Sequence, residues 1–136
     1  MKRDYAVVIV TYNRELLLRE CVRQVEQQTV SASKIIIVNN ASTDGTRQYL
    51  KELSRKNSVY QIIECSQNLG GAGGFARGIA YAINCSIDCV LLIDDDAMIS
   101  VDYMEQLLEV RDRNPQYGAF AGCVLVDGKI DTHHRK

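Results

Sequence analysis

Three consecutive aspartates, Asp94, Asp95 and Asp96, directly follow the apolar residues 91–93. Neighbouring carboxylates repel one another, and a buried carboxylate without a partner is costly. Hard divalent cations prefer oxygen ligands, and the positive charge of such a cation removes this repulsion. The bound cation then attracts an anion such as a diphosphate. Along a strand, Asp94 and Asp96 would point one way and Asp95 the other. The alternative is a solvated loop that leads into a helix.

Two further segments carry small polar side chains directly after apolar runs. In TYN, residues 11–13, Tyr12 can flank a nucleotide base and Asn13 can hold the loop. The segment NNASTDGT, residues 39–46, can read a base or ribose through direct hydrogen bonds, or it can form a turn that caps the next helix. Both interpretations are compatible with the same residues. Its candidate side chains are Asn39, Asn40, Ser42 and Asp44.

The segment NLGGAGGFARG, residues 68–78, contains five glycines. Gly71 to Ala76 matches the G-x-G-x-x-G/A fingerprint of NAD(P)-binding domains, with acidic residues about twenty positions later. Six residues separate Gly71 from the preceding predicted strand, whereas the fingerprint requires a turn directly after the strand. A second interpretation is that the glycines let the backbone approach a diphosphate, with Arg77 as a nearby cation. A flexible surface loop is the third.

The elements that must position these segments follow from hydrophobic periodicity. Apolar, β-branched runs predict five strands, at residues 5–10, 34–38, 59–64, 88–93 and 118–126. Apolar residues at helical spacing predict a helix after each of the first four strands. Ser100 is expected to cap the fourth helix, and Asp127-Gly128 to form a tight turn.

This alternation predicts an α/β fold, with a Rossmann-like, mostly parallel sheet that has helices on both faces. In such sheets, ligands bind outside the carboxyl ends of the strands. All four loops that follow the predicted strands are polar, so we expect them to converge on one edge. That convergence is the strongest argument for a binding site.

Length and composition are those of one ordinary globular domain. The 136 residues are 46% hydrophobic and 24% charged, which is enough for an independent core. A net charge of −1 argues against nucleic acid as a partner. The apolar run at residues 5–10 is too short for a signal or membrane segment, so a cytoplasmic location is expected.

Cysteine and histidine residues do not predict a further metal site. The five cysteines complete no zinc pattern, and they are expected to be small buried side chains in a reducing compartment. His133 and His134 are more typical of a terminal tail than of metal ligands.

With all four loops considered, the chain resembles the family 2 inverting glycosyltransferases, which have the GT-A fold. VVIVTYNR is similar to their first strand and donor loop, and IIIVNNASTDGT to their second strand with its D/N-x-S-x-D-G-T signature. NLGGAGGFARGIAYAI is similar to their N-x-G-x-x-x-A-R-N-x-G segment, and LLIDDDA to their D-x-D segment. The resemblance extends over residues 5–126. It is strongest for galactofuranosyl- and rhamnosyltransferases of cell-wall and surface-polysaccharide synthesis.

The resemblance implies a UDP- or dTDP-sugar donor and a Mn²⁺ or Mg²⁺ ion. The residues that it assigns to the base, ribose, sugar or diphosphate are Thr11, Tyr12, Asn13, Asn40, Ser42, Asp44, Asn68, Arg77, Asp94 and Asp95. Those that it assigns to the metal are Asp96 and Asp94. Many relatives carry Asp in place of Asn40, so this chain lacks one negative charge at the expected base contact.

The family's reaction is attack by an acceptor hydroxyl on the sugar C1 with inversion, while a carboxylate takes the hydroxyl proton. The metal offsets charge on the departing nucleoside diphosphate. In relatives the base and the site for a glycan or lipid-linked acceptor come after the fifth strand. The resemblance therefore implies a single domain, residues 1–136, that is truncated on its acceptor side and inactive alone.

Other expectations concern the surroundings of the site. Residues 118–126 would form a partly uncovered strand that favours a homodimer, and the parent enzyme would associate peripherally with a membrane. Without metal and nucleotide, no bound partner would offset the repulsion within the acidic loop, Asp94 to Asp96, so we expect this loop to be mobile or hydrated. A rigid, salt-bridged triplet buried against Lys or Arg would instead indicate a purely structural role. Two alternatives stay open, namely an NAD(P)-binding domain that uses Gly71 to Ala76 and a non-catalytic nucleotide-binding domain.

Overall fold

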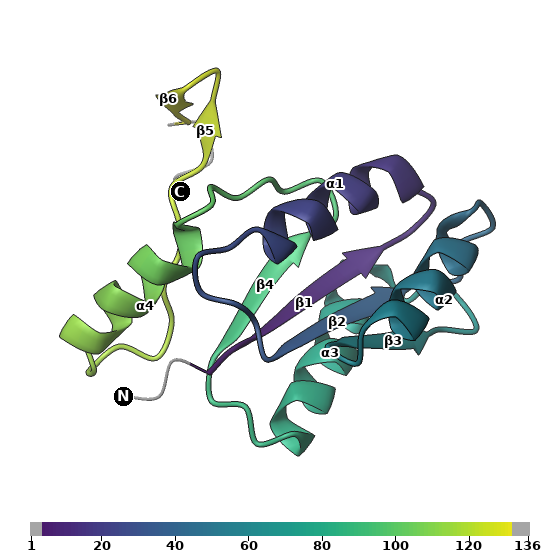
Figure 1. Cartoon of the computed structure of the whole chain (residues 1–136), viewed down its shortest axis with the longest axis horizontal. Helices are drawn as coiled ribbons and strands as arrows, with labels where there is room; N and C mark the ends of the chain where they lie inside the picture. The colour runs from purple at the N-terminus through teal and green to yellow at the C-terminus, as the bar shows by residue number, and fades with distance from the viewer. Residues whose placement is uncertain (1–3, 132–136) are drawn as a thin grey trace.

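A computed structural model of the chain describes residues 4–131 and shows a parallel sheet with helices on both faces (Figure 1). The sheet has four strands in the order β3-β2-β1-β4, which are β1 (Ala6–Thr11), β2 (Lys34–Asn39), β3 (Tyr60–Glu64) and β4 (Val90–Asp94). The helices are α1 (Glu15–Glu26), α2 (Thr46–Lys56), α3 (Gly70–Asn84) and α4 (Tyr103–Arg113). The predicted α/β fold is confirmed, with its first four strands and all four helices.

The central strand β1 is buried along its whole length, because its two faces meet different helices. Val7 and Ile9 belong to the larger core, which α1, α2 and α4 cover. Ala6 and Val8 belong to a smaller core that also contains Ala82 of α3. A continuous apolar run is what a parallel strand with both faces covered requires.

The apolar residues of helix α1 lie on the face that packs against the sheet. Its buried residues are Leu18, Cys21, Val22 and Val25, which recur at intervals of three and four and so lie on one face. The strands run parallel and in register, with Thr11 opposite Asn39 and Asn39 opposite Glu64. The polar loops that follow them therefore meet at one edge, as predicted.

Helix α3 packs directly against the side chains of β1, and two glycines make this possible. A Cβ atom on Gly78 would lie 2.3 Å from Cγ1 of Val8, and one on Gly74 would lie 2.6 Å from Cγ1 of Val10. Both separations are far below van der Waals contact, so only glycine fits. These two glycines therefore serve helix–sheet packing, and the predicted fingerprint, Gly71 to Ala76, lies within the helix instead of in a strand-to-helix turn.

The predicted fifth strand, residues 118–126, is wrong. Only Leu125–Val126 forms a strand, β5, and it pairs antiparallel with β6 (Lys129–Ile130) in a hairpin that stands apart from the sheet (Figure 1). Residues 118–122 are GAFAG, and glycine and alanine favour strands weakly. The predicted turn is confirmed, because Asp127 and Gly128 have φ values of 50° and 74°, as the common two-residue hairpin turn requires.

Three other expectations have mixed outcomes. Ser100 does not cap the fourth helix, since α4 begins at Tyr103 and Asp102 occupies the capping position. Cys21 and Cys65 are buried as expected, whereas the cysteines at positions 85 and 123 are exposed. His133 and His134 lie outside the described residues, and none of the described helices has the length and apolarity needed to cross a membrane.

Candidate functional site

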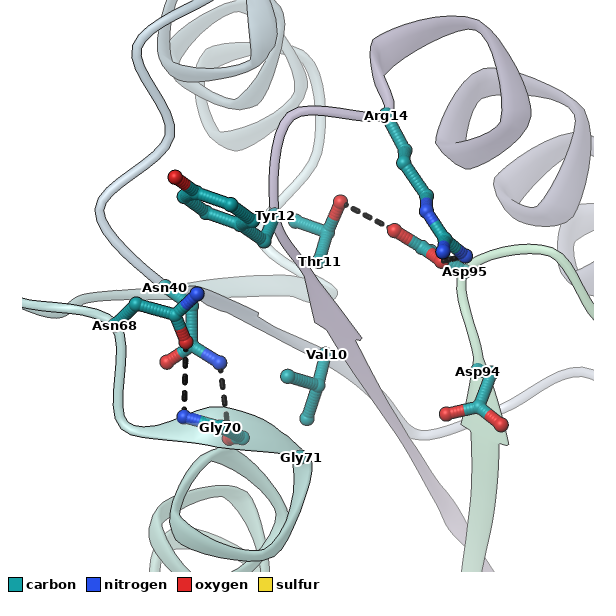
Figure 2. A pocket seen from close by; sticks show the side chains of 10 residues that line it. All are labelled: Val10, Thr11, Tyr12, Arg14, Asn40, Asn68, Gly70, Gly71, Asp94 and Asp95. Carbon is teal, nitrogen blue, oxygen red and sulfur yellow. Dashed lines mark hydrogen bonds and ion pairs between the residues drawn. The ribbon is translucent and has the colours of Figure 1, made fainter.

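A pocket of about 270 Å³ opens at the carboxyl ends of β1 and β4, beside the start of α3 (Figure 2). The strand order reverses between β1 and β4, because β2 and β3 lie on one side of β1 and β4 lies on the other. Parallel sheets bind ligands outside the carboxyl ends of the strands at such a switch point. The lining residues are Val10, Thr11, Tyr12, Arg14, Asn40, Asn68, Gly70, Gly71, Asp94 and Asp95.

The pocket has two sides of different chemistry. Tyr12, Asn40 and Asn68 lie on one side in Figure 2, and all three are uncharged. Arg14, Asp94 and Asp95 lie on the other, with Val10 between the two sides. The arrangement suits a ligand with an uncharged ring system at one end and a charged group at the other.

Asp95 is the buried member of the acidic loop. It is 4% exposed, and its Oδ2 accepts a 2.8 Å hydrogen bond from the hydroxyl of Thr11. Its Oδ1 lies 3.4 Å from Nη1 of Arg14. Thr11 is itself buried, so this pair fixes the loop to the end of β1. The expectation of a mobile or hydrated loop without a charge partner is therefore wrong for Asp95, which is buried and paired with Arg14.

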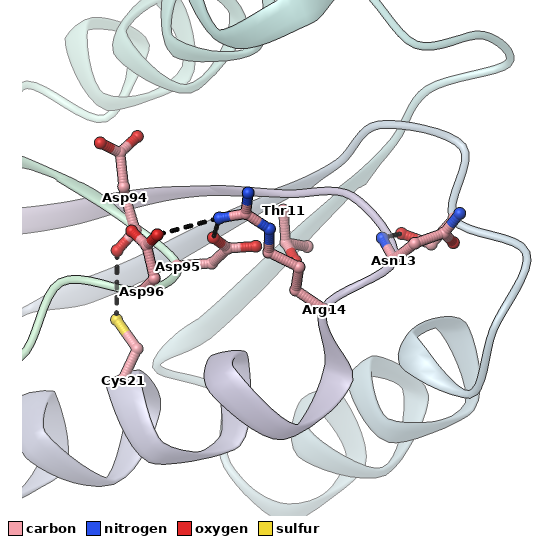
Figure 3. Close-up of polar contacts among 8 residues, drawn as sticks. Thr11, Asn13, Arg14, Cys21, Asp94, Asp95 and Asp96 are labelled. Atoms are coloured by element: carbon pink, nitrogen blue, oxygen red, sulfur yellow. Dashed lines mark hydrogen bonds and ion pairs between the residues drawn. The ribbon is translucent and has the colours of Figure 1, made fainter.

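Asp94 and Asp96 are both exposed, but they face different surroundings. Nη1 of Arg14 lies 3.0 Å from Oδ2 of Asp96, so Asp95 and Asp96 converge on one guanidinium (Figure 3). The Asp94 carboxylate points away from Arg14 and makes no hydrogen bond or ion pair with the described residues. The predicted alternation fails here because β4 ends at Asp94, and the next two residues form a turn.

The acidic loop lies beside Cys21, a buried residue of α1, and helps to raise the pKa of its thiol. The Cys21 thiol donates to the backbone oxygen of Asp94, with 3.6 Å between sulfur and oxygen. Burial, and secondarily the negative charges of Asp95, Asp96 and Asp94, raise the pKa of the Cys21 thiol to about 12. The thiolate is therefore scarce at neutral pH.

We expect iodoacetamide at about pH 8 to modify Cys85 in the folded protein and to leave Cys21 intact, because alkylation requires an accessible thiolate. Peptide mass spectrometry after a timed quench measures both sites. In urea, Cys21 should react as fast as Cys85. Equal rates in the folded protein would contradict the burial and raised pKa of Cys21.

Asn13 joins the loop after β1 to the loop after β2. Its backbone N–H donates to Oγ of Ser42 at 3.0 Å, and its Oδ1 accepts from the backbone N–H of Thr43 at 2.7 Å. Oδ2 of Asp44 accepts from the backbone N–H of Glu15 at 3.4 Å. Asn13 has a φ of 53°, which asparagine tolerates better than most residues. These contacts hold the two loops together.

Asn40 and Asn68 fix the start of α3. The buried side chain of Asn40 donates through Nδ2 to the carbonyl of Gly70 at 3.0 Å, and its Oδ1 accepts from the backbone N–H of Leu69 at 3.4 Å. Oδ1 of Asn68 accepts from the backbone N–H of Gly70 at 2.8 Å. Gly70 has a φ of 71°, so this turn needs glycine. An aspartate at position 40 lacks the N–H groups for the bond to Gly70.

The structure brings most of the predicted site residues together. Those that line the pocket are Thr11, Tyr12, Asn40, Asn68, Asp94 and Asp95. Asn13, Ser42 and Asp44 lie in the joined loops, Asp96 is held by Arg14, and Arg77 is exposed two turns into α3. These five are not among the lining residues.

Sequence reasoning gave no role to Arg14 or Val10, which also line the pocket. For Arg14 a signal was present, since three adjacent carboxylates at one strand end call for a cation from a neighbouring loop. Val10 carries no such signal, because apolar residues at strand ends are common.

A family model described as Glycosyl transferase family 2 matches residues 6–136, which is nearly the whole chain. The chain belongs to glycosyltransferase family 2. The expected family is confirmed on this match. The more specific likeness to galactofuranosyl- and rhamnosyltransferases is not shown by it.

Known relatives of this family 2 chain include the poly-beta-1,6-N-acetyl-D-glucosamine synthase of Staphylococcus epidermidis. The two are 27% identical over 122 residues, which cover 90% of this chain and 29% of the synthase. The fold is that of Staphylococcus aureus TarS 1–349 in complex with UDP-GlcNAc, with a TM-score of 0.68 and 23% identity over 82% of this chain and 32% of that one.

A second solved structure of the same fold is the mannosyltransferase PcManGT from Pyrobaculum calidifontis in complex with GDP-Man and Mn²⁺. Its TM-score is 0.61 at 22% identity, over 69% of this chain and 28% of that one. The family 2 chain thus spans less than a third of each of these three proteins.

The residues of the acidic loop suit a Mn²⁺ or Mg²⁺ ion only in part. Carboxylate oxygens are the right donors, and such ions are held by one or two carboxylates together with substrate phosphates and water. Asp94 and Asp96 are exposed enough to serve, whereas both oxygens of Asp95 already have partners. Within residues 4–131, no three His, Cys, Asp or Glu side chains are grouped to hold a metal. The remaining ligands would have to come from phosphate and water.

Proposed function

We propose that this chain binds a nucleoside diphosphate sugar in the pocket between β1 and β4, as the donor-binding part of a metal-dependent inverting glycosyltransferase. The observation that carries the proposal is the two-sided pocket at the switch point of a family 2 domain. Its uncharged side suits a nucleoside, and its acidic side suits a cation with a diphosphate.

The nucleoside would lie against Tyr12, Asn40 and Asn68. The Tyr12 side chain is 46% exposed, which leaves a ring face for a base to contact. Asn40 is held in one orientation by Gly70 and Leu69, so its remaining donor and acceptor positions are fixed for a base or ribose. Such fixed polar groups give specificity more than affinity.

The diphosphate would lie between the acidic loop and the start of α3. Asp94 and Asp96 would hold the cation, which when bound neutralises charge that grows on the departing nucleoside diphosphate. Gly70 and Gly71, in the first turn of α3, line the same pocket, and the start of a helix favours an anion. The proton acceptor for the attacking hydroxyl is not assigned to any residue of this chain.

The donor and acceptor of the whole enzyme stay predictions. Solved structures of the same fold hold UDP-GlcNAc or GDP-Man, and one relative is a poly-beta-1,6-N-acetyl-D-glucosamine synthase. UDP-GlcNAc is therefore the first donor to test within the predicted class of UDP- and dTDP-sugars. A glycan or lipid-linked acceptor, peripheral membrane association and a cytoplasmic location fit cell-surface polysaccharide synthesis.

We expect UDP-GlcNAc to raise the melting temperature of the protein when Mn²⁺ is present and to have little effect in EDTA. At one hundred times its Kd, a ligand stabilises the folded state by about 2.7 kcal/mol, which is an easily measured shift. Differential scanning fluorimetry with a titration of UDP-GlcNAc checks this result. Asp94→Ala and Asp96→Ala should each abolish the shift.

Asp88→Ala is the matched control, because Asp88 is exposed and lies at the opposite end of β4. It should leave the shift unchanged. The absence of any shift at millimolar nucleotide and metal would contradict the proposal. A metal-independent shift with NAD⁺ that survives Asp96→Ala would favour the NAD(P)-binding alternative.

A further inference from the structure

Arg14 carries the positive charge that holds the acidic loop in this structure. A single atom, Nη1, lies 3.0 Å from Oδ2 of Asp96 and 3.4 Å from Oδ1 of Asp95. Three carboxylates and one guanidinium leave a net formal charge of −2 at the loop. The guanidinium of Arg14 therefore occupies a position where a divalent cation would balance the loop charge more completely.

The position of Arg14 opposes the stability of its own helix. Arg14 directly precedes α1, at the capping position, and makes no capping hydrogen bond with its side chain. The amino end of a helix carries a partial positive charge, so a cation there is unfavourable. The ion pairs with Asp95 and Asp96 offset this unfavourable interaction. The position of Arg14 therefore argues for a role in the site and not in the stability of α1.

The two ion pairs of Arg14 differ in how firmly the carboxylate is held. Asp95 is buried and also accepts a hydrogen bond from Thr11, so its release would leave a buried hydroxyl without an acceptor. The Asp96 side chain is 50% exposed, and its hydrogen bond within the described residues is the one from Arg14. The Arg14 side chain is 52% exposed, so it has room to move.

We propose that Arg14 is an exchangeable counter-cation, which gives up Asp96 to a divalent metal and transfers its guanidinium to the diphosphate of the donor. This inference rests on the proposed donor site and adds to it a residue that couples metal binding to nucleotide binding. Arg14 already lines the pocket on its charged side, as Figure 2 shows. A guanidinium forms strong, paired hydrogen bonds with phosphate oxygens.

The exchange has two energetic consequences of opposite sign. A metal that binds alone must first break the Arg14–Asp96 pair, which lowers its affinity. Exposed pairs of this kind are weak, so the loss corresponds to about a three-fold to five-fold change in Kd. A nucleotide that binds with the metal gains a charge-assisted contact with Arg14, which corresponds to about ten-fold or more in Kd.

Arg14→Gln should therefore bind Mn²⁺ alone about three-fold to five-fold more tightly than the wild type, and should bind UDP at saturating Mn²⁺ about ten-fold more weakly. Isothermal titration calorimetry measures both constants on the whole chain. Arg14→Lys keeps the charge but loses the planar fork, so it should recover wild-type metal affinity and only part of the UDP affinity.

Arg47→Gln is the control for general loss of positive charge at this edge. Arg47 is similarly exposed, at 54%, and pairs with Glu64 at the end of β3 instead of with the acidic loop. It should change neither constant appreciably. Equal effects of Arg14→Gln and Arg47→Gln would overturn the inference, and so would weaker binding of both ligands by Arg14→Gln.

The test separates this inference from the proposed function. If the wild type binds neither Mn²⁺ nor UDP, the donor site itself is absent. If it binds both and Arg14→Gln behaves like the wild type, the donor site stands and the exchange is refuted. Side-chain ¹⁵N resonances of arginine add a direct readout, because Mg²⁺ alone should shift the Arg14 guanidinium signal and leave that of Arg47 in place.

Discussion

Replacing Gly78 with alanine is expected to destabilise the protein by about 2 kcal/mol. The new methyl group would lie 2.3 Å from Cγ1 of Val8, a fully buried side chain of the central strand. Overpacking of this kind costs about 3 kcal/mol, and the better helix propensity of alanine returns about 1 kcal/mol. Urea denaturation followed by circular dichroism measures the change in the free energy of unfolding.

Gly71→Ala is the control for this experiment, since it makes the same change in the first turn of the same helix. A Cβ atom there meets nothing within 4 Å, so the variant should be as stable as the wild type or slightly more stable. Val8→Ala should be less harmful in the Gly78→Ala background than alone, with a coupling of about 1 kcal/mol or more. A Gly78→Ala protein of undiminished stability would mean that α3 does not pack this closely.

Replacing Asp95 with alanine is expected to lower the free energy of unfolding by about 3 kcal/mol in metal-free buffer. The substitution leaves the buried hydroxyl of Thr11 without its acceptor and removes a partner of Arg14. Hydrogen bonds to charged groups contribute about 1.5–3 kcal/mol, and a buried donor left unsatisfied adds to that loss. Relief of repulsion from the two exposed aspartates is small, because water and salt screen exposed charges.

Asp96→Ala is the control here, because it removes a neighbouring carboxylate whose side chain is 50% exposed. Its cost should stay below about 1 kcal/mol, as for other exposed ion pairs. Thermal and urea unfolding in EDTA compare the two variants. Equal losses would mean that Asp95 is not the residue that fixes the loop to β1.

These two predictions concern residues that the sequence had singled out for other reasons. One interpretation of the glycine-rich segment was a close approach of its backbone to a diphosphate, but two of its glycines, Gly74 and Gly78, face the side chains of β1. The aspartate triplet predicted a metal site on Asp94 and Asp96 and a donor contact for Asp95, and the structure adds that Thr11 donates a hydrogen bond to Asp95. In both cases the residue types were informative, and the partner that decides their role lies on a distant segment.

The fifth predicted strand failed for a related reason. A strand needs a neighbour to pair with, and residues 118–124 find none in the described sheet, where β4 is an edge. Their apolar character alone does not specify that neighbour. The predicted homodimer through this segment is untested, although Val124, Leu125 and Val126 are more than half exposed.

The sequence by itself determined the first four strands, the four helices, their order and the edge at which the polar loops meet. These features depend on periodicity and on turn residues, which act over a few neighbouring positions. Only the tertiary structure decided which carboxylate is buried, which one an arginine holds and which one faces the pocket. Thr11 and Asp95 are 84 positions apart, and Arg14 and Asp96 are 82 apart. Contacts over such separations exist only once the sheet has brought the strand ends together, so no local pattern records them.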